Sequence, residues 1–179
     1  MQQKACRVQN GAAIMEYGGA LMMFVCFLLI PLIDIGMIPI RHFFAAGTIN
    51  DLGYRMGHCK KRSDAYTMLT SEAWWKHSLN TFGVNINNAS LTLIACAQSG
   101  EKATFSQSQT LPPQWLPNGT KGPCIYSVNL NTIVKMNPIY LGKVGLPGFN
   151  TPITFDITSR SSWENLGCDP NTLQYYINE

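Results

Sequence analysis

The chain has 179 residues, a formal net charge of +3 and 13% charged residues, about half of the usual ~25%. With residues 1–40, the leader and the apolar run, set aside, 139 residues remain, which is enough for one domain with one core. The net charge is small, and the basic cluster Lys60-Lys61-Arg62 is short, of the kind found in solvated turns. Both observations argue against a nucleic-acid partner.

A short leader precedes a long apolar run. Residues 1–11 are polar, whereas residues 12–40 are almost wholly apolar, and the stretch Gly18–Ile38 alone has the length of about 20 helical residues that crosses a hydrocarbon core. In a cleaved secretory signal the small-residue cut site follows the apolar core. Here the small residues Gly11 and Ala12 precede it, so the helix stays attached after processing. We predict a leader peptide over 1–11 and a transmembrane helix over 12–40.

Two acidic residues, Glu16 and Asp34, lie in this run. A carboxylate at a bilayer centre costs about 2.5–3.5 kcal/mol on insertion scales and less near the edge, so each needs a reason to be there. We expect Asp34 to face protein or the outer headgroup region. Pro31 and Pro39 remove backbone donors and predict a kink or a loosened turn. Simple bending of the helix and stretching inside a filament are both compatible with these prolines.

The junction carries a family resemblance. Gly11, four intervening residues and Glu16-Tyr17 resemble the prepilin peptidase site of the Flp class of type IVb pilins. The longer stretch 11–55, about a quarter of the chain, resembles the N-terminal region of TadE-type pseudopilins of tight-adherence systems. The matching pieces are Gly11-Ala12-Ala13, Glu16-Tyr17, Leu32-Ile33-Asp34-Ile35-Gly36 and Ala45-Ala46.

The resemblance implies a function and partners. A prepilin peptidase would cut between Gly11 and Ala12, which leaves Glu16 as the fifth residue of a minor pilin that takes part in Flp-type pilus assembly. The new amine of Ala12 would pair with Glu16 of its own or a neighbouring chain and set the register between subunits. The implied partners are the peptidase, other pilins or pseudopilins and the inner-membrane assembly platform. The alternative is an uncleaved, signal-anchored periplasmic binding module stapled by disulfides.

The orientation follows from charges and cysteines. Lys4 and Arg7 favour a cytoplasmic N-terminus, although Arg41 and Lys60-Lys61-Arg62 flank the other end of the run. Cysteines in the remaining part decide in favour of a periplasmic C-terminal domain, because disulfides form outside the cytoplasm. We therefore expect a single-pass membrane protein with a cytoplasmic N-terminus. The resemblance implies that the membrane is the bacterial inner membrane and that the chain can be incorporated in a surface pilus.

Four cysteines lie in the domain expected over 41–179: Cys59, Cys96, Cys124 and Cys168. None forms a Cys-x-x-Cys pair, which argues against a redox motif or a zinc site. Four cysteines in an exported domain predict two disulfides, for which three connectivities exist. We expect Cys59–Cys96 and Cys124–Cys168, because neighbours in sequence close the shorter loops.

The elements after the membrane run predict an α+β fold. One helix is expected from about residue 12 to about Gly57, and a second, capped by Ser63 or Asp64, to about Leu79. Phe43-Phe44 and Trp74-Trp75 are interpreted as core residues, with an interfacial anchor as the alternative for the tryptophans. Strands are expected at 91–97, 103–105, 125–134 and 153–158, and loops rich in Gly and Pro at 111–122 and 137–152. Together they give a long N-terminal transmembrane helix packed on a small antiparallel sheet, the pilin-like architecture that the resemblance also implies.

No catalytic or cofactor site is expected. The chain has no Gly-rich phosphate loop and no zinc-protease or nucleophile-elbow motif. His58 and His77 lack acidic or cysteine neighbours at metal-ligand spacing, and Asp156 with Glu164 is explained as solvated surface. The sequence therefore predicts no catalytic residue and no metal, and the family resemblance implies that the chain is the substrate of an enzyme, a prepilin peptidase.

Overall fold

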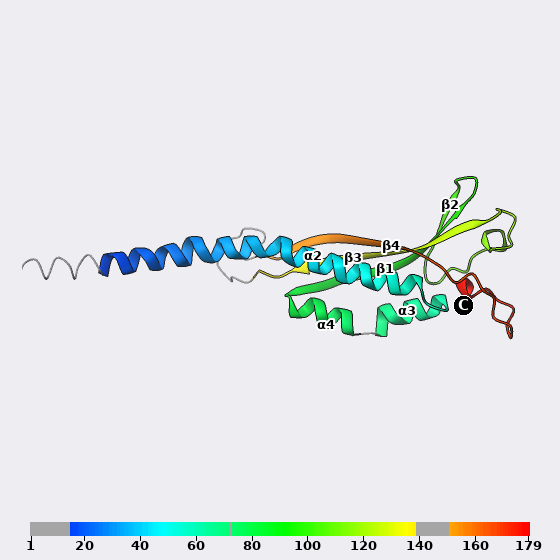
Figure 1. The fold of residues 1–179 in the computed structure, drawn as a ribbon, viewed down its shortest axis with the longest axis horizontal. Helices are drawn as coiled ribbons and strands as arrows, with labels where there is room; N and C mark the ends of the chain where they lie inside the picture. Colours follow the sequence, from blue (N-terminus) through cyan, green and yellow to red (C-terminus); the bar gives the residue numbers. More distant parts are fainter. Residues whose placement is uncertain (1–14, 72, 139–150) are drawn as a thin grey trace, which may run out of the picture. The chain divides into compact units, whose positions relative to one another are not determined.

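The computed structural model describes residues 15–71, 73–138 and 151–179. Figure 1 shows the order of the elements along the chain. Contacts divide the chain into two compact units, one of residues 1–40 and 137–153 and one of residues 41–136 and 154–179. The expected leader and most of the loop at 137–152 lie outside the described residues.

One helix runs from Met15 to Gly57, as the sequence predicts for the described part of that range. Within it, Val25–Leu29 forms a π-helical turn, η1, and Ile30–Gly57 forms α2. α2 ends at Gly57, where a glycine is needed for a steric reason. A Cβ at this position would collide with the main-chain oxygen of Ser162 and with the side chain of Ser161, so glycine lets the end of α2 approach this segment closely.

The second helical region is two helices, α3 (Arg62–Ser71) and α4 (Trp74–Thr81), so the prediction of one continuous helix to Leu79 is wrong. Packing explains the break. Leu69 and Trp75 are six residues apart, which on one continuous helix places them about 120° apart around its axis. A new start at Trp74 lets Trp75 and Leu79 join Leu69 in the core.

Four strands form one sheet in the order β2-β1-β3-β4, and β1 pairs antiparallel with both β2 and β3. The strands are β1 (Val84–Ala97), β2 (Lys102–Phe105), β3 (Cys124–Met136) and β4 (Ile153–Ser162). The predicted α+β class and all four predicted strands are confirmed. β1 begins earlier than the predicted residue 91, because the Asn-rich stretch before it pairs with the end of β3 across a β-bulge between Ile86 and Asn88.

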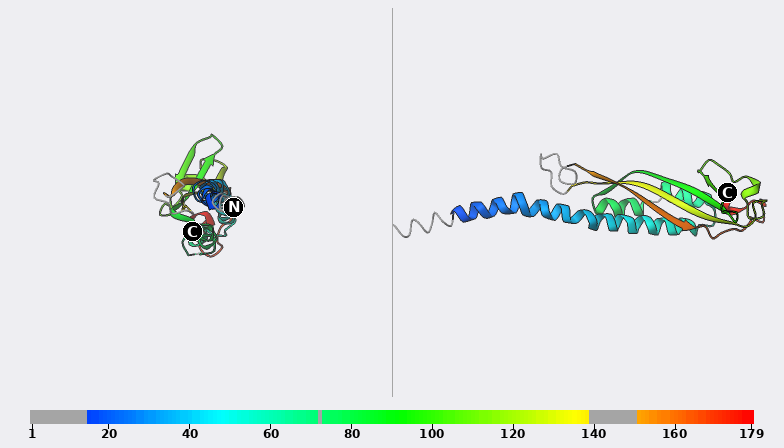
Figure 2. Two further views of the ribbon diagram at one scale, coloured as in Figure 1. Left: turned by 90° about the vertical axis from the view of Figure 1, so that its left-hand side faces the viewer. Right: turned by 90° about the horizontal axis from the view of Figure 1, so that it is seen from above.

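The core lies on one face of this sheet. Alternate residues of β1 and β3 are buried there, beginning on β1 with Leu91, Leu93 and Ala95. Residues between them, such as Thr92 and Asn129, point to the other face. Figures 1 and 2 show α3 and α4 together on one side of the sheet. The helical residues buried with the sheet are Ala45, Ile49, Leu52, Met56, Ala65, Tyr66, Leu69, Trp75 and Leu79.

In each of the two aromatic pairs, one residue packs in or against the core and the other is exposed. Trp75 is fully buried as expected, whereas Trp74 keeps 38% of its surface exposed. Phe44 packs against the core, but Phe43 is 75% exposed, so the interpretation of Phe43 as a core residue is wrong. Neighbouring residues on a helix differ by about 100° in direction, and the side of α2 that carries Ala45 and Ile49 leaves Phe43 outside.

Candidate functional site

The first candidate site is the apolar helix itself. By length and composition, Met15–Gly57 is long and apolar enough to cross a membrane. Its N-terminal part keeps large apolar side chains exposed, including Phe27 (77%), Leu32 (62%) and Ile33 (54%). Exposed apolar surface of this extent marks a contact with lipid or with another protein.

The π turn lies directly before Pro31. Proline has no N–H, so the carbonyl one turn before it loses its α-helical partner. In η1 the N–H of Ile30 bonds to the carbonyl of Val25, five residues back, which widens this turn. The loosened turn predicted near Pro31 is therefore present. Pro39 lies inside α2, which continues through it.

Asp34 is the buried acidic residue of this helix. Its side chain is 2% exposed, whereas Leu32, Ile33 and Ile35 around it are each more than half exposed. Asp34 also makes a polar interaction in the structure. A carboxylate in an apolar segment is expected to be held in this way, because an isolated charge there is costly.

The processing motif is only partly described. Glu16 and Tyr17 are helical and exposed, Tyr17 to 71%. Gly11 and Ala12, the expected cleavage site, lie outside the described residues. The assignment of these four residues stays a prediction.

Neither expected disulfide is present. Cys96, Cys124 and Cys168 are free thiols, and Cys59 Sγ donates a hydrogen bond to Arg55 O over 3.5 Å. The pairing Cys59–Cys96 fails for a topological reason. Cys96 alternates with buried residues of β1 and so points away from the core, whereas Cys59 packs against the core.

The pairing Cys124–Cys168 is absent too, and each of the two thiols has its own surroundings. Cys124 lies opposite Ala97 on the core face of the sheet and is half-buried. Cys168 is exposed, and its Sγ donates to Asp169 O over 3.8 Å. The orientation expected for the chain therefore rests on the basic residues of its leader.

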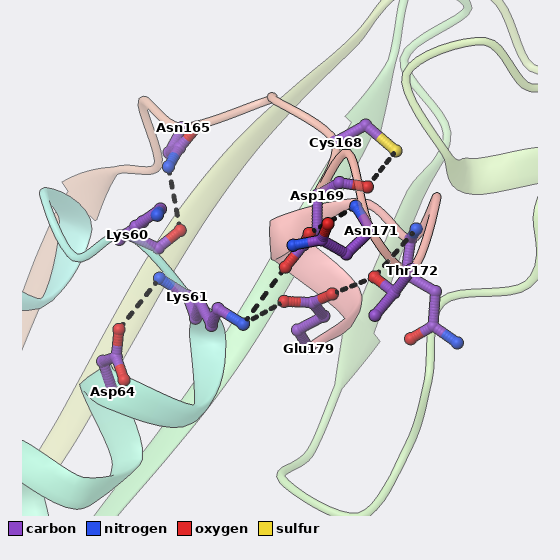
Figure 3. Close-up of polar contacts among 10 residues, drawn as sticks. Lys60, Lys61, Asp64, Asn165, Cys168, Asp169, Asn171, Thr172 and Glu179 are labelled. Atoms are coloured by element: carbon purple, nitrogen blue, oxygen red, sulfur yellow. Dashed lines mark hydrogen bonds and ion pairs between the residues drawn. The ribbon is translucent and has the colours of Figure 1, made fainter.

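The second candidate site is polar, and it holds residues near Glu179 to the start of α3 (Figure 3). Lys61 Nζ lies 2.6 Å from Glu179 Oε2 and 3.6 Å from Asp169 Oδ2. Thr172 Oγ1 donates to Glu179 Oε1 over 2.6 Å, and Ser63 N donates to Glu179 O over 2.8 Å. The ion pairs and the Ser63 bond fix the segment after Asp169 against the N-terminus of α3, and the Thr172 bond lies within that segment.

The charges of this cluster stabilise one another. The hydrogen bond from Lys61 lowers the pKa of the Glu179 carboxyl, and the same bond raises the pKa of Lys61. The pKa of Asp169 is lowered mainly by a hydrogen bond from Asn171 N. The sequence did not predict this cluster, because Lys61 lies more than a hundred positions before Asp169 and Glu179 and the three residues form no motif.

A pocket of about 300 Å³ adjoins the cluster. Its lining is mostly hydroxyl and amide groups, with Arg62 from α3 beneath them. Arg62 is 6% exposed and donates to Gln109 O over 2.8 Å and to Ser106 O. Because its guanidinium donates hydrogen bonds to these two carbonyl oxygens, Arg62 holds the loop after β2 against α3.

The residues with acid–base or metal-binding chemistry are dispersed. Glu164 Oε1 lies 3.1 Å from His58 Nε2, whereas Asp156 lies on the outer face of β4 with Thr158. Among the described residues, no three His, Cys, Asp or Glu side chains are grouped as metal ligands would be. His77 lies on the exposed side of α4.

Comparison with protein-family models, with curated proteins and with solved structures found no significant match to the chain. The functional argument therefore rests on the residues and their geometry.

Proposed function

We propose that the chain is a TadE-like minor pilin or pseudopilin, processed by a prepilin peptidase and taking part in the assembly of a Flp-type, tight-adherence pilus. The observation that carries the proposal is the position of Gly11, Glu16 and Tyr17 at the start of an apolar helix that leaves its side chains exposed. A helix of this kind has to be covered by lipid before assembly and by neighbouring helices after it.

Processing and assembly use different residues in this proposal. The peptidase needs the small Gly11, because a bulky side chain would obstruct the approach of the backbone to its active site. Removal of residues 1–11 then frees the α-amine of Ala12. Glu16 pairs with this amine on its own or a neighbouring chain, and a carboxylate–ammonium pair in apolar surroundings strongly favours the register in which it closes. Head-to-tail contacts repeated in this way build an open filament.

Two variants separate these steps. Gly11→Val is expected to leave the full-length chain in the membrane. Glu16→Leu is expected to be inserted and cut to a chain that starts at Ala12, yet to fail to join its pilin partners. N-terminal sequencing of protein from the native membrane reads the cut, and co-purification with other pilins reads the assembly.

Each outcome has a distinct meaning. Wild-type protein that keeps residues 1–11 would exclude processing and leave the signal-anchored binding module as the function. Normal assembly of Glu16→Leu would leave the cut intact but refute the pairing mechanism. Asp34→Asn removes the other carboxylate of the helix and keeps the size of the side chain, so it is the control for loss of a charge elsewhere in the helix.

The binding-module alternative has one observation in its favour, the polar pocket beside Arg62. A pocket of about 300 Å³ is at the lower end of the ~300–1,000 Å³ range of small-molecule sites. Thr67→Trp would fill its mouth from α3. If this variant is processed and assembled like the wild-type chain, the pocket is not needed for the pilin role.

A further inference from the structure

A hollow of about 420 Å³ lies between β1 and the break that separates α3 from α4. The end of α3 contributes Leu69 and Thr70 to its lining, the start of α4 contributes Trp75 and Lys76, and β1 contributes residues 86–89. All of these residues belong to the second unit, and Figure 1 shows both helices beside β1. The volume lies within the ~300–1,000 Å³ of small-molecule sites, so the hollow can receive a group of the size of an amino-acid side chain.

The indole of Trp75 is a buried polar group that lines this hollow. Trp75 is fully buried, and its Nε1 has no hydrogen-bond acceptor among the described residues. Trp163 shows the usual arrangement, since its Nε1 donates to Asn165 O over 2.7 Å. A buried N–H without an acceptor has lost its water and has gained no hydrogen bond in return. An acceptor that enters the hollow beside Trp75 removes this cost.

The start of α4 favours an acceptor with negative charge. Ala73 is the N-cap of α4, and an alanine has no side-chain acceptor for the N–H groups of the first turn. The ammonium group of Lys76 lies 5.2 Å from the centroid of the Trp75 ring. Lys76 forms no ion pair with the described residues. A helix N-terminus and a cation both attract an anion, and both lie next to the unpartnered indole.

The β1 wall of the hollow supplies amide groups. Asn87 is the extra residue of the β-bulge and has no partner on β3, whereas Asn88 pairs with Ile133. A bulge turns side chains out of the regular alternation of a strand, and both asparagines are exposed and line the hollow. Their side chains can donate hydrogen bonds. None of the described residues that line the hollow is acidic, so no charge there repels an anion.

We infer that this hollow binds a carboxylate, which accepts hydrogen bonds from Trp75 Nε1 and from the Lys76 ammonium. A carboxylate presents two oxygens to two donors at once and carries the negative charge that Lys76 favours. A neutral acceptor, such as water or an amide, satisfies Trp75 but leaves Lys76 without a counter-ion. The inference does not depend on the proposed function, because it uses residues of the second unit alone. The source of the carboxylate is an acidic side chain of a partner protein or a small carboxylic acid.

Indole N–H signals test the contact in the full chain in detergent. The four tryptophans, labelled with nitrogen-15 in the indole, give four signals in a proton–nitrogen NMR spectrum. The signal of Trp75 is identified by its loss in Trp75→Phe or by the through-space contact of its ring with the Lys76 amide. Sodium acetate is expected to move this signal downfield until it saturates. Acetamide and sodium chloride at the same concentration should leave it in place, and the bonded indole of Trp163 should not respond to any of the three.

A pair of lysine variants measures the contribution of the ammonium group. Lys76→Met removes the charge and keeps the apolar stem, and it should weaken acetate binding about tenfold, as the loss of one charge-assisted hydrogen bond does. Lys102→Met is the matched control, because Lys102 is an exposed lysine on β2. Both are surface substitutions, so this comparison decides even if Trp75→Phe does not fold.

The source of the carboxylate is read from a second probe. Glutamate with an acetylated amine and an amidated α-carboxyl presents one side-chain carboxylate on a peptide backbone. Tighter binding of this probe than of acetate assigns the hollow to an acidic side chain of a partner, and equal binding assigns it to a small carboxylic acid. Both results require that the corresponding blocked glutamine does not bind.

Four results would overturn the inference. The first is a Trp75 signal that acetate does not move, the second is an equal response to acetamide, and the third is equal acetate binding by Lys76→Met and Lys102→Met. The fourth concerns Glu72, which stands between α3 and α4 in the sequence and outside the described residues. An upfield shift of the Trp75 signal in Glu72→Gln without acetate would mean that the chain's own carboxylate occupies the hollow.

Discussion

Both halves of α2 carry large apolar side chains, but the exposure of these side chains differs between the halves. In the first half Leu32, Ile33 and Ile35 are more than half exposed, whereas in the second half Ala45, Ile49 and Leu52 are fully buried. The second half presents a stripe at helical spacing to a sheet in the same unit, and the first half is apolar almost all around. Hydropathy alone therefore does not locate a protein core, because the same residue types also serve a helix whose solvent is lipid.

The largest effect is expected from shortening a buried side chain in the second half. Leu52→Ala removes a fully buried side chain and should lower the free energy of unfolding by about 2–5 kcal/mol. The matched change in the first half, Leu32→Ala, should cost much less in detergent, because Leu32 is 62% exposed. Chemical denaturation of the full chain in detergent, followed by near-ultraviolet circular dichroism, measures both. Equal losses would mean that the two halves do not differ in packing.

A smaller effect is expected at the glycines of α2. A Cβ at Gly57 would meet main-chain atoms, so Gly57→Ala should destabilise by about 1–3 kcal/mol. At Gly47 a Cβ has no atom within 4 Å, and Gly47→Ala should stabilise the helix by about 0.5–1 kcal/mol. The same denaturation experiment gives both signs. Destabilisation by Gly47→Ala would show that its open side is covered in solution.

The smallest effect is expected from the Lys61 cluster, whose members are partly exposed and screened by solvent. The pKa values of Glu179 and Asp169 are lowered, so their stabilising contribution is present above the ordinary carboxyl range and is lost as pH falls through the lowered values. The pKa of Lys61 is raised, so its contribution is present below the ordinary lysine value and is lost as pH rises through the raised one.

Hydrogen exchange of the backbone amide of Ser63, which donates to Glu179 O, reads this cluster directly. Its protection should fall as the pH drops below the ordinary carboxyl range and through the lowered pKa of Glu179, after correction for the intrinsic exchange rate, and the fall should shrink in Glu179→Gln. The amide of Leu69, in the last turn of α3, serves as the internal control. An equal fall at Leu69 would mean that acid loosens α3 as a whole.

The sequence predicts local structure well and distant contacts poorly. Alternation of apolar and polar residues located β4, and the uninterrupted run located the first helix. The break between α3 and α4 was not predictable from local signals, since it serves the burial of Leu69 and Trp75 on one core. The cysteine pairing went wrong because loop length ignores which face of a strand a side chain occupies, and Cys96 is on the face opposite Cys59.

The π turn η1 has a consequence for helical phase. Glu16 and Asp34 are 18 residues apart, which on an ideal α-helix is five whole turns and would align the two carboxylates on one side. A single π turn inserts one residue and offsets the two parts of the helix by roughly 100°. The two carboxylates therefore point in different directions around the axis. A neighbouring chain that pairs with Glu16 therefore approaches a different side of the helix from the side on which Asp34 is already buried.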